Sequence, residues 1–488
     1  MPKKIQSTRG FIDWNPDLLI GGQYKKGSRK NRIDVIDPSN GLTLGTVANA
    51  SVEDAISAID AAHSAAASWA ATPMRGRSEI LRNCFELIIK NSDEIAKIIS
   101  LENGKALKDA RGEVAYAAEF FRWFSEEGPR VSGDLRPAPS GNNQILVQYQ
   151  PIGVSVLITP WNFPAAMATR KIAPALAAGC TCVLKPATST PLTAFAIASI
   201  LETAGVPKGV VNVITTSSTS EVVDAMLHDP RVRKLSFTGS TEVGRVLLRK
   251  AADQVISSSM ELGGNAPFIV FEDADIERAV EGAIIAKMRN GGEACTAANR
   301  FLVQRPVAEI FTKRLAEAMS KLKVGPGVNE DTDCGPLVDE ATIEKVVALV
   351  KDAKARGARV CCGGQRMGKS SLYYPPTVLA NVPLGAEIFK NEIFGPVAAI
   401  YTFDTEEEAI QLANNTEYGL IAYLYTRDVA RGMRVAANLE AGMIALNRGI
   451  VSDPAAPFGG VKQSGLGREG AQHGILEFLE AKYIATTW

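Results

Sequence analysis

The chain reads KLSFTGSTEVG at residues 234–244, which is an apolar run, a tight turn and the start of a helical pattern. We expect a strand at 234–238 and a helix at 245–250. The glycines are spaced G-x-x-x-x-G and no Gly-Lys-Ser/Thr follows, so the turn is not a P-loop. A turn that joins a strand to a helix can still hold a pyrophosphate on the helix N–H groups, but many turns share this pattern.

Similar apolar runs lie on both sides of this stretch, separated by enough residues for a helix between neighbours. We expect strands at Val154–Thr159, Thr181–Lys185, Val210–Ile214 and Ser257–Glu261. This alternation indicates βαβ units and a doubly wound parallel sheet. Because ligands bind beyond the carboxyl ends of the strands in such sheets, the residues after each strand are the first candidates for function.

A second α/β pattern begins after Asn265, with Asp275 as the expected cap of a helix at 276–289. Strands are expected at or near 268–271, 359–362, 398–403, 422–425 and 443–446. The stretch 447–468 is rich in Gly, Pro and Ser and longer than most connections, which favours a functional loop.

Two pairs of residues have the spacing of helix capping boxes, namely Ser51 with Asp54 and Thr405 with Glu408. More helices are expected after the first pair, where they would cover the sheet. The tail 475–488 has a β-like pattern and an apolar end, so we expect it to pack against a neighbouring segment.

The composition excludes several classes of protein. A chain of 488 residues is expected to form two or more domains. Lys plus Arg equals Asp plus Glu, 53 against 53, so the charge does not indicate nucleic acid or a membrane surface as a partner. The 7 cysteines do not make a disulfide framework, and no secretory signal or membrane helix is evident. We therefore expect a cytoplasmic protein.

One cysteine, Cys295, lies in a loop of small residues at Asn290–Arg300. Gly291 and Gly292 are expected to end the preceding helix, because glycine tolerates the left-handed backbone of a C-terminal cap. We expect a short helical turn to start at Cys295, and its free N–H groups would favour a thiolate. A buried structural cysteine is the alternative, and the loop alone does not decide between the two.

Two polar residues at strand ends also have two interpretations each. Asn162, in the run Pro160–Pro164, is either a functional amide or the N-cap of a helix. Glu261 is either a functional carboxylate or the partner of a lysine or arginine. Their positions at the ends of parallel strands, together with the cysteine loop, favour function for both.

The motifs taken together resemble those of the aldehyde dehydrogenase superfamily. The resemblance extends over nearly the whole chain in order and spacing, and it is carried by 160–164, 237–241, 261–265, the Cys295 loop, 392–396 and 457–460. Within this family the chain is most similar to the NADP-preferring succinate-semialdehyde dehydrogenases, notably at 122–128 and 234–244.

The resemblance implies an α/β fold with three parts. These are a Rossmann-type cofactor domain with a parallel sheet (1–130 and 151–261), an α/β catalytic domain (262–474) and a β oligomerisation arm (131–150 and 475–488). It also implies a homodimer or a homotetramer.

The resemblance further implies oxidation of an aldehyde through a thioester. Cys295 would attack the aldehyde, and the Asn162 amide and the Cys295 backbone N–H would hold the oxyanion, where losing one donor costs ~10²–10³ in rate. Glu261 would activate the water that hydrolyses the thioester, since a glutamate whose pKa is raised by burial can serve as the base. None of the 3 histidines lies in a matching motif.

The implied cofactor is NADP, with NAD also possible, and no metal is expected. NAD-preferring members carry a glutamate where this chain has Thr188, and Lys185 could pair with the 2′-phosphate of NADP. The implied cofactor-binding residues are Thr159, Pro160, Trp161, Asn162, Lys185, Ala187, Thr188, Gly239, Ser240, Leu262, Glu392 and Phe394.

The implied substrate is a small molecule with a carboxylate, held by Arg170, Arg289 and Ser452. Arg289 could instead be an ordinary cation at a helix end, and Arg170 could lie on an exposed helix face. Arg448 replaces a small polar residue of similar enzymes and could add a contact to the acid. Succinate semialdehyde is the expected substrate.

Several other functions remain open at this point. Glutarate semialdehyde or a broad range of aldehydes could be the substrate, and a CoA-acylating enzyme would release its thioester to CoA. Different classes are a cysteine hydrolase and a catalytically silent structural or binding relative.

Overall fold

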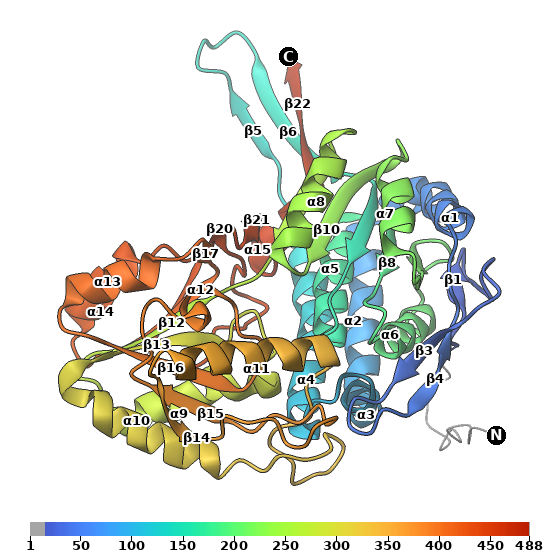
Figure 1. Ribbon diagram of the computed structural model, residues 1–488. Helices are drawn as coiled ribbons and strands as arrows, with labels where there is room; N and C mark the ends of the chain where they lie inside the picture. Colours follow the sequence, from blue (N-terminus) through green and yellow to red (C-terminus); the bar gives the residue numbers. More distant parts are fainter. Residues whose placement is uncertain (1–14, 488) are drawn as a thin grey trace.

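The structure is a computed structural model that describes residues 15–487, so residues 1–14 of the expected cofactor domain lie outside the described residues. Figure 1 shows two lobes side by side and a narrow arm that projects from them. The α/β fold expected from the sequence is confirmed, because each lobe contains a mainly parallel sheet covered by helices.

The sheet of the first lobe has the order β2-β1-β9-β8-β7-β10-β11-β21. Its central strands β9, β8, β7, β10 and β11 are parallel, as expected from the alternation of apolar runs. Antiparallel strands add to both edges. The bounds are β1 Leu18–Ile20, β2 Gln23–Lys25, β7 Val154–Ile158, β8 Cys182–Lys185, β9 Val211–Val213, β10 Val232–Thr238, β11 Ser257–Glu261 and β21 Gly465–Leu466.

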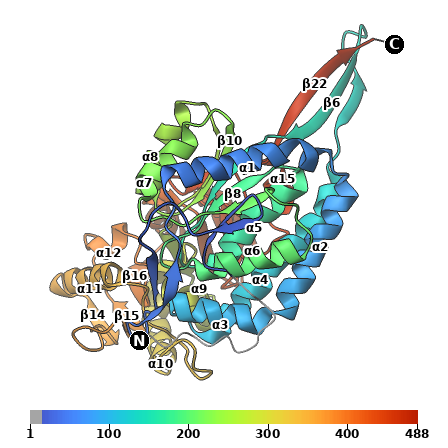
Figure 2. The same cartoon turned by 90° about the vertical axis from the view of Figure 1, so that its right-hand side faces the viewer.

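Helices cover both faces of this sheet (Figures 1 and 2), and every residue of α5 is buried between its neighbours. The capping box of α1 is confirmed, since Ser51 and Asp54 each accept a backbone N–H of the other. The bounds are α1 Val52–Ala71, α2 Met74–Lys90, α3 Ser92–Asn103, α4 Leu107–Glu127, η1 Gly128–Arg130, α5 Pro164–Ala178, α6 Leu192–Thr203, α7 Thr219–Leu227 and α8 Thr241–Ala252. A small hairpin pairs β3 Ile33–Ile36 with β4 Thr43–Val47.

The helix after the 234–244 stretch starts earlier than expected. It begins at Thr241 rather than 245, because the Ser240 side chain caps it by accepting the Val243 N–H. The turn between β10 and α8 is therefore shorter, and the helix N-terminus lies directly at the carboxyl end of the strand.

The sheet of the second lobe has the order β14-β15-β16-β13-β12-β18-β19, and only β14 is antiparallel. Its bounds are β12 Ala266–Val270, β13 Ala298–Gln304, β14 Arg359–Cys362, β15 Thr377–Ala380, β16 Val397–Phe403, β18 Ile421–Tyr425 and β19 Met443–Leu446. The sequence did not predict β15. The helices are α9 Ile276–Met288, η2 Arg289–Gly292, α10 Arg305–Ser320, α11 Glu340–Ala355, α12 Glu387–Lys390, α13 Glu406–Asn414 and α14 Val429–Asn438.

The second expected capping box is only half formed. The Thr405 side chain accepts the Glu408 N–H, as expected. The Glu408 carboxylate, however, accepts the N–H of Asp404 rather than that of Thr405. The prediction of a reciprocal box was therefore wrong by one residue.

The arm is a separate antiparallel sheet of β5 Asp134–Pro137, β6 Gln144–Pro151 and β22 Leu479–Thr486. It extends away from both lobes in Figures 1 and 2. The strand of the tail starts at Leu479, after the short helix α15 Ala471–Leu476, and it packs against β6 of the same chain. A further ribbon pairs β17 Tyr418–Gly419 with β20 Val461–Lys462.

Within residues 15–487, the helices are too short or too polar for any of them to span a lipid bilayer.

Candidate active site

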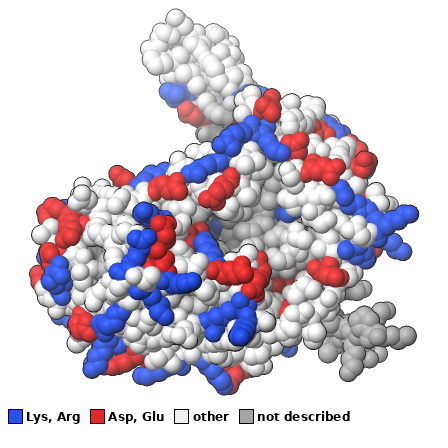
Figure 3. All heavy atoms as spheres, viewed as in Figure 1, with Lys and Arg blue, Asp and Glu red and all other residues white. Residues whose placement is uncertain are grey.

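A cavity of about 240 Å³ lies where the two lobes meet. Figure 3 shows the surface hollowed between the lobes, with few charged side chains in the hollow itself. Residues from both lobes line the cavity, namely Pro160, Trp161, Asn162, Phe163, Met167, Thr238, Gly239, Ser240, Leu262, Gly263, Cys295, Thr342, Lys345, Glu392 and Phe394. The structure thus brings Asn162 and Cys295 to one cavity, although they are far apart in the chain.

The cysteine loop differs from the sequence expectation. The backbone of Asn290, Gly291 and Gly292 is left-handed, with φ of 53°, 59° and 82°, and this ends α9 as expected. A Cβ at Gly292 would lie 2.3 Å from the Gly395 carbonyl oxygen, so only glycine fits there. Cys295 lies in a turn, however, and no helix starts at this residue.

The expected thiolate-favouring environment of Cys295 was therefore wrong for this structure. Without a helix N-terminus, burial dominates and raises the pKa of the Cys295 thiol to about 12. The charges of Arg170 and Arg289 oppose this rise, and that of Glu261 adds to it. The thiol consequently needs a base to remove its proton.

Asn162 is not a helix cap. The N-cap of α5 is Phe163, and Asn162 is buried with an exposed fraction of 5%. Its side-chain Nδ2 donates to the Glu293 carbonyl oxygen at 3.0 Å, which leaves the second N–H of the amide available. The N-cap alternative is thus wrong, and the amide is held beside the cysteine loop.

Glu261 is not the partner of a lysine or arginine. It ends β11 with an exposed fraction of 4%, and no ion pair or hydrogen bond of its side chain is found within residues 15–487. Burial raises the pKa of this carboxyl well above the usual range, and the negative charge of Glu469 raises it further. Gly459 of the 447–468 loop covers it so closely that a Cβ would lie 2.9 Å from Oε1.

Arg170 lies in a closed cluster of charges. Its exposed fraction is 1%, its Nε contacts Glu469 and its guanidinium carbon lies 4.2 Å from the centre of the Phe458 ring. Lys171 also contacts Glu469, with 2.6 Å between Nζ and Oε1. The alternative of an exposed helix face was wrong for Arg170. Its charge is already balanced, and it does not line the cavities described around Cys295 and Arg289.

Arg289 and Ser452 come together, as the resemblance implied. Arg289 Nη1 donates to Ser452 Oγ at 2.8 Å, and both side chains line a cavity of about 370 Å³ next to Tyr116. In the described part of the chain Arg289 has no acidic partner. It is the C-cap residue of α9, so its position matches the helix-end alternative, but that alternative does not explain its bond to Ser452 or its place on the cavity wall. Arg448 is exposed and does not line this cavity.

A larger cavity of about 760 Å³ adjoins the first one at Pro160, Trp161 and Ser240. Lys185 lines it with an exposed fraction of 5%, and within the described chain it has no ion pair. Burial lowers the pKa of Lys185 to about 8. The other expected residues on its walls are Thr159, Ala187, Thr188 and Gly239. An unpaired cation and the N-terminus of α8 in one open cavity fit an anionic dinucleotide.

Glu392 and Phe394 line the first cavity, together with Cys295. The Glu392 carboxylate accepts the Gly264 N–H at 3.1 Å, and burial raises its pKa to about 7. Phe394 has a left-handed backbone, with φ of 57°, and its ring packs edge-on against Trp161 at 5.4 Å between ring centres. Leu262, the last expected cofactor contact, packs against Gly244 at the start of α8.

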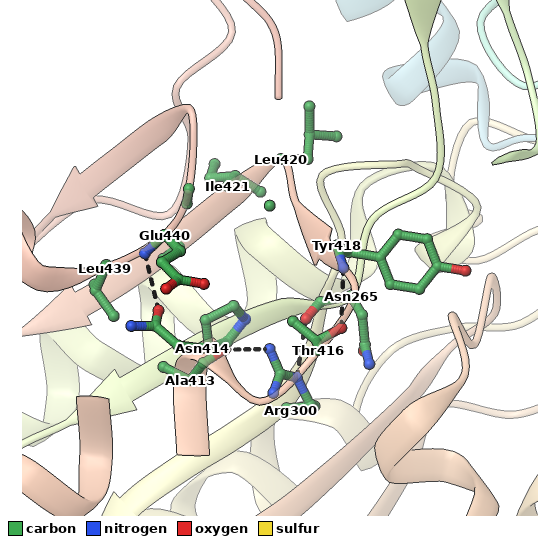
Figure 4. Close-up of a pocket in the computed structure, with 14 residues that line it drawn as sticks. Asn265, Arg300, Ala413, Asn414, Thr416, Tyr418, Leu420, Ile421, Leu439 and Glu440 are labelled. Carbon is green, nitrogen blue, oxygen red and sulfur yellow. Dashed lines mark hydrogen bonds between the residues drawn. The ribbon is translucent and has the colours of Figure 1, made fainter. Parts of the chain in front are cut away.

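A much smaller hollow of about 10 Å³ in the second lobe has a structural role (Figure 4). The buried Arg300 at its wall donates to the carbonyl oxygens of Asn265, Leu412 and Ala413. These bonds join β13 to the end of α13, and they leave no free charge for a ligand.

Sequence reasoning missed the buried groups that surround Asn162. Lys105 and Glu113 contact each other at 2.5 Å, and Lys105 also reaches the Asn162 carbonyl oxygen. A signal was present, because Glu113 lies three residues after Ala110 and four before Ala117 on the apolar face of α4. Glu469 gave no such signal.

Comparison with known proteins gives one consistent result. The profile described as the aldehyde dehydrogenase family matches residues 24–484. A succinate-semialdehyde dehydrogenase of Paenarthrobacter nicotinovorans is 55% identical over 90% of this chain and 98% of its own. A glutarate-semialdehyde dehydrogenase of Pseudomonas putida is 47% identical over 95% and 96%. The crystal structure of an NADP-dependent enzyme of Escherichia coli superposes with a TM-score of 0.96, at 47% identity over 97% and 98% of the two chains.

Proposed function

Because the chain belongs to the aldehyde dehydrogenase family, we propose that it oxidises succinate semialdehyde to succinate with NADP, and less efficiently with NAD. The observation that carries this proposal is the inter-lobe cavity, which both Cys295 and Asn162 line, together with the buried and unpaired Glu261 at the end of β11. Sulfur, amide and carboxyl are the groups that oxidation through a thioester requires.

The first step is attack of the Cys295 sulfur on the aldehyde carbon. Since burial raises the pKa of the thiol, its proton must pass to solvent as the sulfur attacks. The carbonyl oxygen becomes an oxyanion, which the free N–H of Asn162 stabilises. A bound nicotinamide supplies the hydride acceptor that this chain's side chains lack.

The second step is hydrolysis of the thioester on Cys295. Glu261 takes a proton from water, the new C–O bond forms and the C–S bond breaks, which returns Cys295 and releases the acid. A carboxyl whose pKa is raised by burial is a better base near neutral pH than an ordinary glutamate. This argues against release of the thioester to CoA, and identification of the product without added CoA tests it. A product that forms only with CoA would contradict the proposal.

The preference for NADP rests on Lys185 and Thr188. Both line the larger cavity, Lys185 forms no ion pair within residues 15–487 and Thr188 is neutral. A 2′-phosphate would provide that counter-charge, whereas NAD would leave it unpaired. Glu392 and Phe394 would hold the nicotinamide end.

The preference for an aldehyde with a distal carboxylate rests on Arg289 and Ser452. They present a cation and a hydroxyl to a cavity in which Arg289 has no described acidic partner. Arg170 does not line this cavity, so the proposed contacts to the carboxylate are those of Arg289 and Ser452. The relative that acts on glutarate semialdehyde supports the longer homologue as an alternative substrate.

The arm supports assembly of two or four copies, and we propose separately that the protein works in the cytoplasm. Its outer strands β5 and β22 are sheet edges, and Leu135 and Tyr483 on them are exposed at 60% and 59%. Exposed apolar strand edges favour pairing with another chain. The proposed boundaries are those of the sequence analysis, 1–130 and 151–261, 262–474, and 131–150 with 475–488.

The experiment that tests the function is steady-state kinetics on succinate semialdehyde, glutarate semialdehyde and butanal, each with NADP and with NAD. The expected order of kcat/KM is succinate semialdehyde first and butanal last. Equal values for the acid and for butanal would contradict the assigned substrate. Turnover without any nicotinamide would favour a cysteine hydrolase, and no turnover at all a silent relative.

A further inference from the structure

A buried ion pair lies directly beneath the segment that carries Asn162. Lys105 Nζ and Glu113 Oε2 are 2.5 Å apart, and both side chains are fully buried. Neither residue lines the cavity described around Cys295. The pair therefore needs an explanation other than contact with substrate or cofactor.

The two members of the pair hold opposite ends of one short segment. Lys105 Nζ donates to the Asn162 carbonyl oxygen at 2.6 Å. Glu113 Oε1 accepts the N–H groups of Ala165 and Ala166, at 2.8 and 3.2 Å, in the first turn of α5. The segment 162–166 is thus fixed on both sides by a single pair of charges from the neighbouring α4 region.

The cysteine loop is attached to the same point. Asn290 Nδ2 donates to the Asn162 carbonyl oxygen at 2.8 Å and also to the Glu293 carbonyl oxygen at 3.0 Å. The Asn162 side chain donates to that same Glu293 oxygen. Asp109 of α4 accepts the Asn290 backbone N–H at 3.0 Å. The start of α4 therefore fixes the amide and the cysteine loop relative to each other.

A structural role alone does not account well for charges at this place. Replacing a buried ion pair by apolar side chains of similar volume is often neutral or stabilising, since desolvation offsets the attraction. What apolar side chains cannot do is donate to the Asn162 carbonyl or accept the N–H groups at the start of α5. The pair therefore fixes the orientation of the segment 162–166 and does not mainly add stability.

We propose that Lys105 and Glu113 are positioning residues, which hold the Asn162 peptide so that its side-chain amide points at the oxyanion formed on Cys295. The proposal rests on the proposed function, because it assumes that Asn162 stabilises this oxyanion. It adds a role for two residues that touch neither substrate nor cofactor.

The test is a double-mutant cycle of Lys105→Met and Asn162→Ala, with kcat and both KM values measured for succinate semialdehyde and NADP. Lys105→Met alone is expected to lower kcat about 10-fold or more and to leave KM for NADP within about twofold. In the Asn162→Ala background the same change is expected to alter kcat by less than about twofold, because the amide it positions is absent. Lys97→Met, on the exposed face of α3, is the control and should match the wild type.

Two outcomes separate this proposal from the function on which it rests. If Asn162→Ala keeps the wild-type kcat, the oxyanion role itself is wrong. If Asn162→Ala is slow but Lys105→Met is as fast as the wild type, or the two losses multiply fully, the positioning role alone is overturned. If Lys105→Met does not fold, the same double-mutant cycle with Asn162→Ala is measured with Glu113→Gln, which keeps the side-chain volume and an acceptor oxygen.

Discussion

The surroundings of Arg170 and of Arg289 differ, although the sequence suggested one role for both residues. Arg170 is fully buried against Glu469 and Phe458, so its charge is neutralised within the protein. Arg289 is half-buried, is bonded to the hydroxyl of Ser452 and faces a cavity, so its charge is available to a ligand. The comparison teaches that a charged residue must be judged by whether the fold has already supplied its partner.

Glu261 is buried near the charges of Arg170 and Glu469, and the role of Glu261 can be tested by the variant Glu261→Gln. We expect a loss of ~10²–10⁴ in kcat, the usual contribution of a general base. The pH dependence should change as well. Burial raises the pKa of Glu261, so wild-type activity should rise as pH increases and the carboxyl loses its proton, and this limb should be absent from the variant. Measuring kcat as a function of pH checks both the loss of rate and the loss of this rise. If the variant kept the same rise of activity with pH, a residue other than Glu261 would be the base.

The two arginines should differ sharply in stability when they are replaced. Arg170→Ala leaves Glu469 buried beside Lys171 alone, which should lower the free energy of unfolding by ~3–5 kcal/mol, the typical cost of breaking a buried pair. Arg289→Ala removes only a hydrogen bond to Ser452 at a half-buried site, so a cost of ~1 kcal/mol is expected. Urea unfolding measures both. Equal losses would show that the regions do not differ as described.

Selectivity for the aldehyde with a carboxylate should depend more on Arg289 than on Arg170, which is the reverse of the order expected for stability. In Arg289→Ala, kcat/KM for succinate semialdehyde should fall by ~10–150-fold, equivalent to the ~1.5–3 kcal/mol of a hydrogen bond to a charged group. The value for butanal should stay close to that of the wild type. Arg448→Ala is the matched control, since Arg448 is exposed and outside the cavity, and it should keep the wild-type ratio.

The cofactor cavity extends the comparison, because Lys185 resembles Arg289 in having no described acidic partner. Its pKa of about 8 means that it is positively charged below pH 8 and loses this charge above it. KM for NADP should therefore rise by up to ~10-fold between pH 7 and pH 9, with KM for NAD unchanged. In Lys185→Met the dependence on pH should disappear. A parallel rise for NAD would contradict the assignment of Lys185 to the phosphate.

The sequence predicted the parts of the site that lie at strand ends. Apolar runs locate Glu261 and the segment before α5, and small residues locate the cysteine loop, because these signals are local. It failed where partners come from distant segments. Lys171 and Glu469 are 298 positions apart, and nothing near Arg170 reveals that Glu469 neutralises it. The thiolate prediction failed for the same reason, since burial by the whole fold outweighs the local turn.

The edge of the second sheet shows the same limit. Strand β15 is only Thr377–Ala380, flanked by prolines, and such a short run is not distinguishable from a loop by pattern alone. Its place in the sheet comes from pairing with β16 and β14.

The account depends on Cys295, Asn162 and Glu261 acting on one aldehyde, and trapping the covalent intermediate tests this most directly. Glu261→Gln is mixed with succinate semialdehyde and NADP, quenched in acid and examined by peptide mass spectrometry. The account predicts a succinyl group on Cys295, formed more slowly when Asn162→Ala is added and absent when Cys295 is replaced by serine. NADPH formation by Glu261→Gln with no acyl group on Cys295 would contradict it.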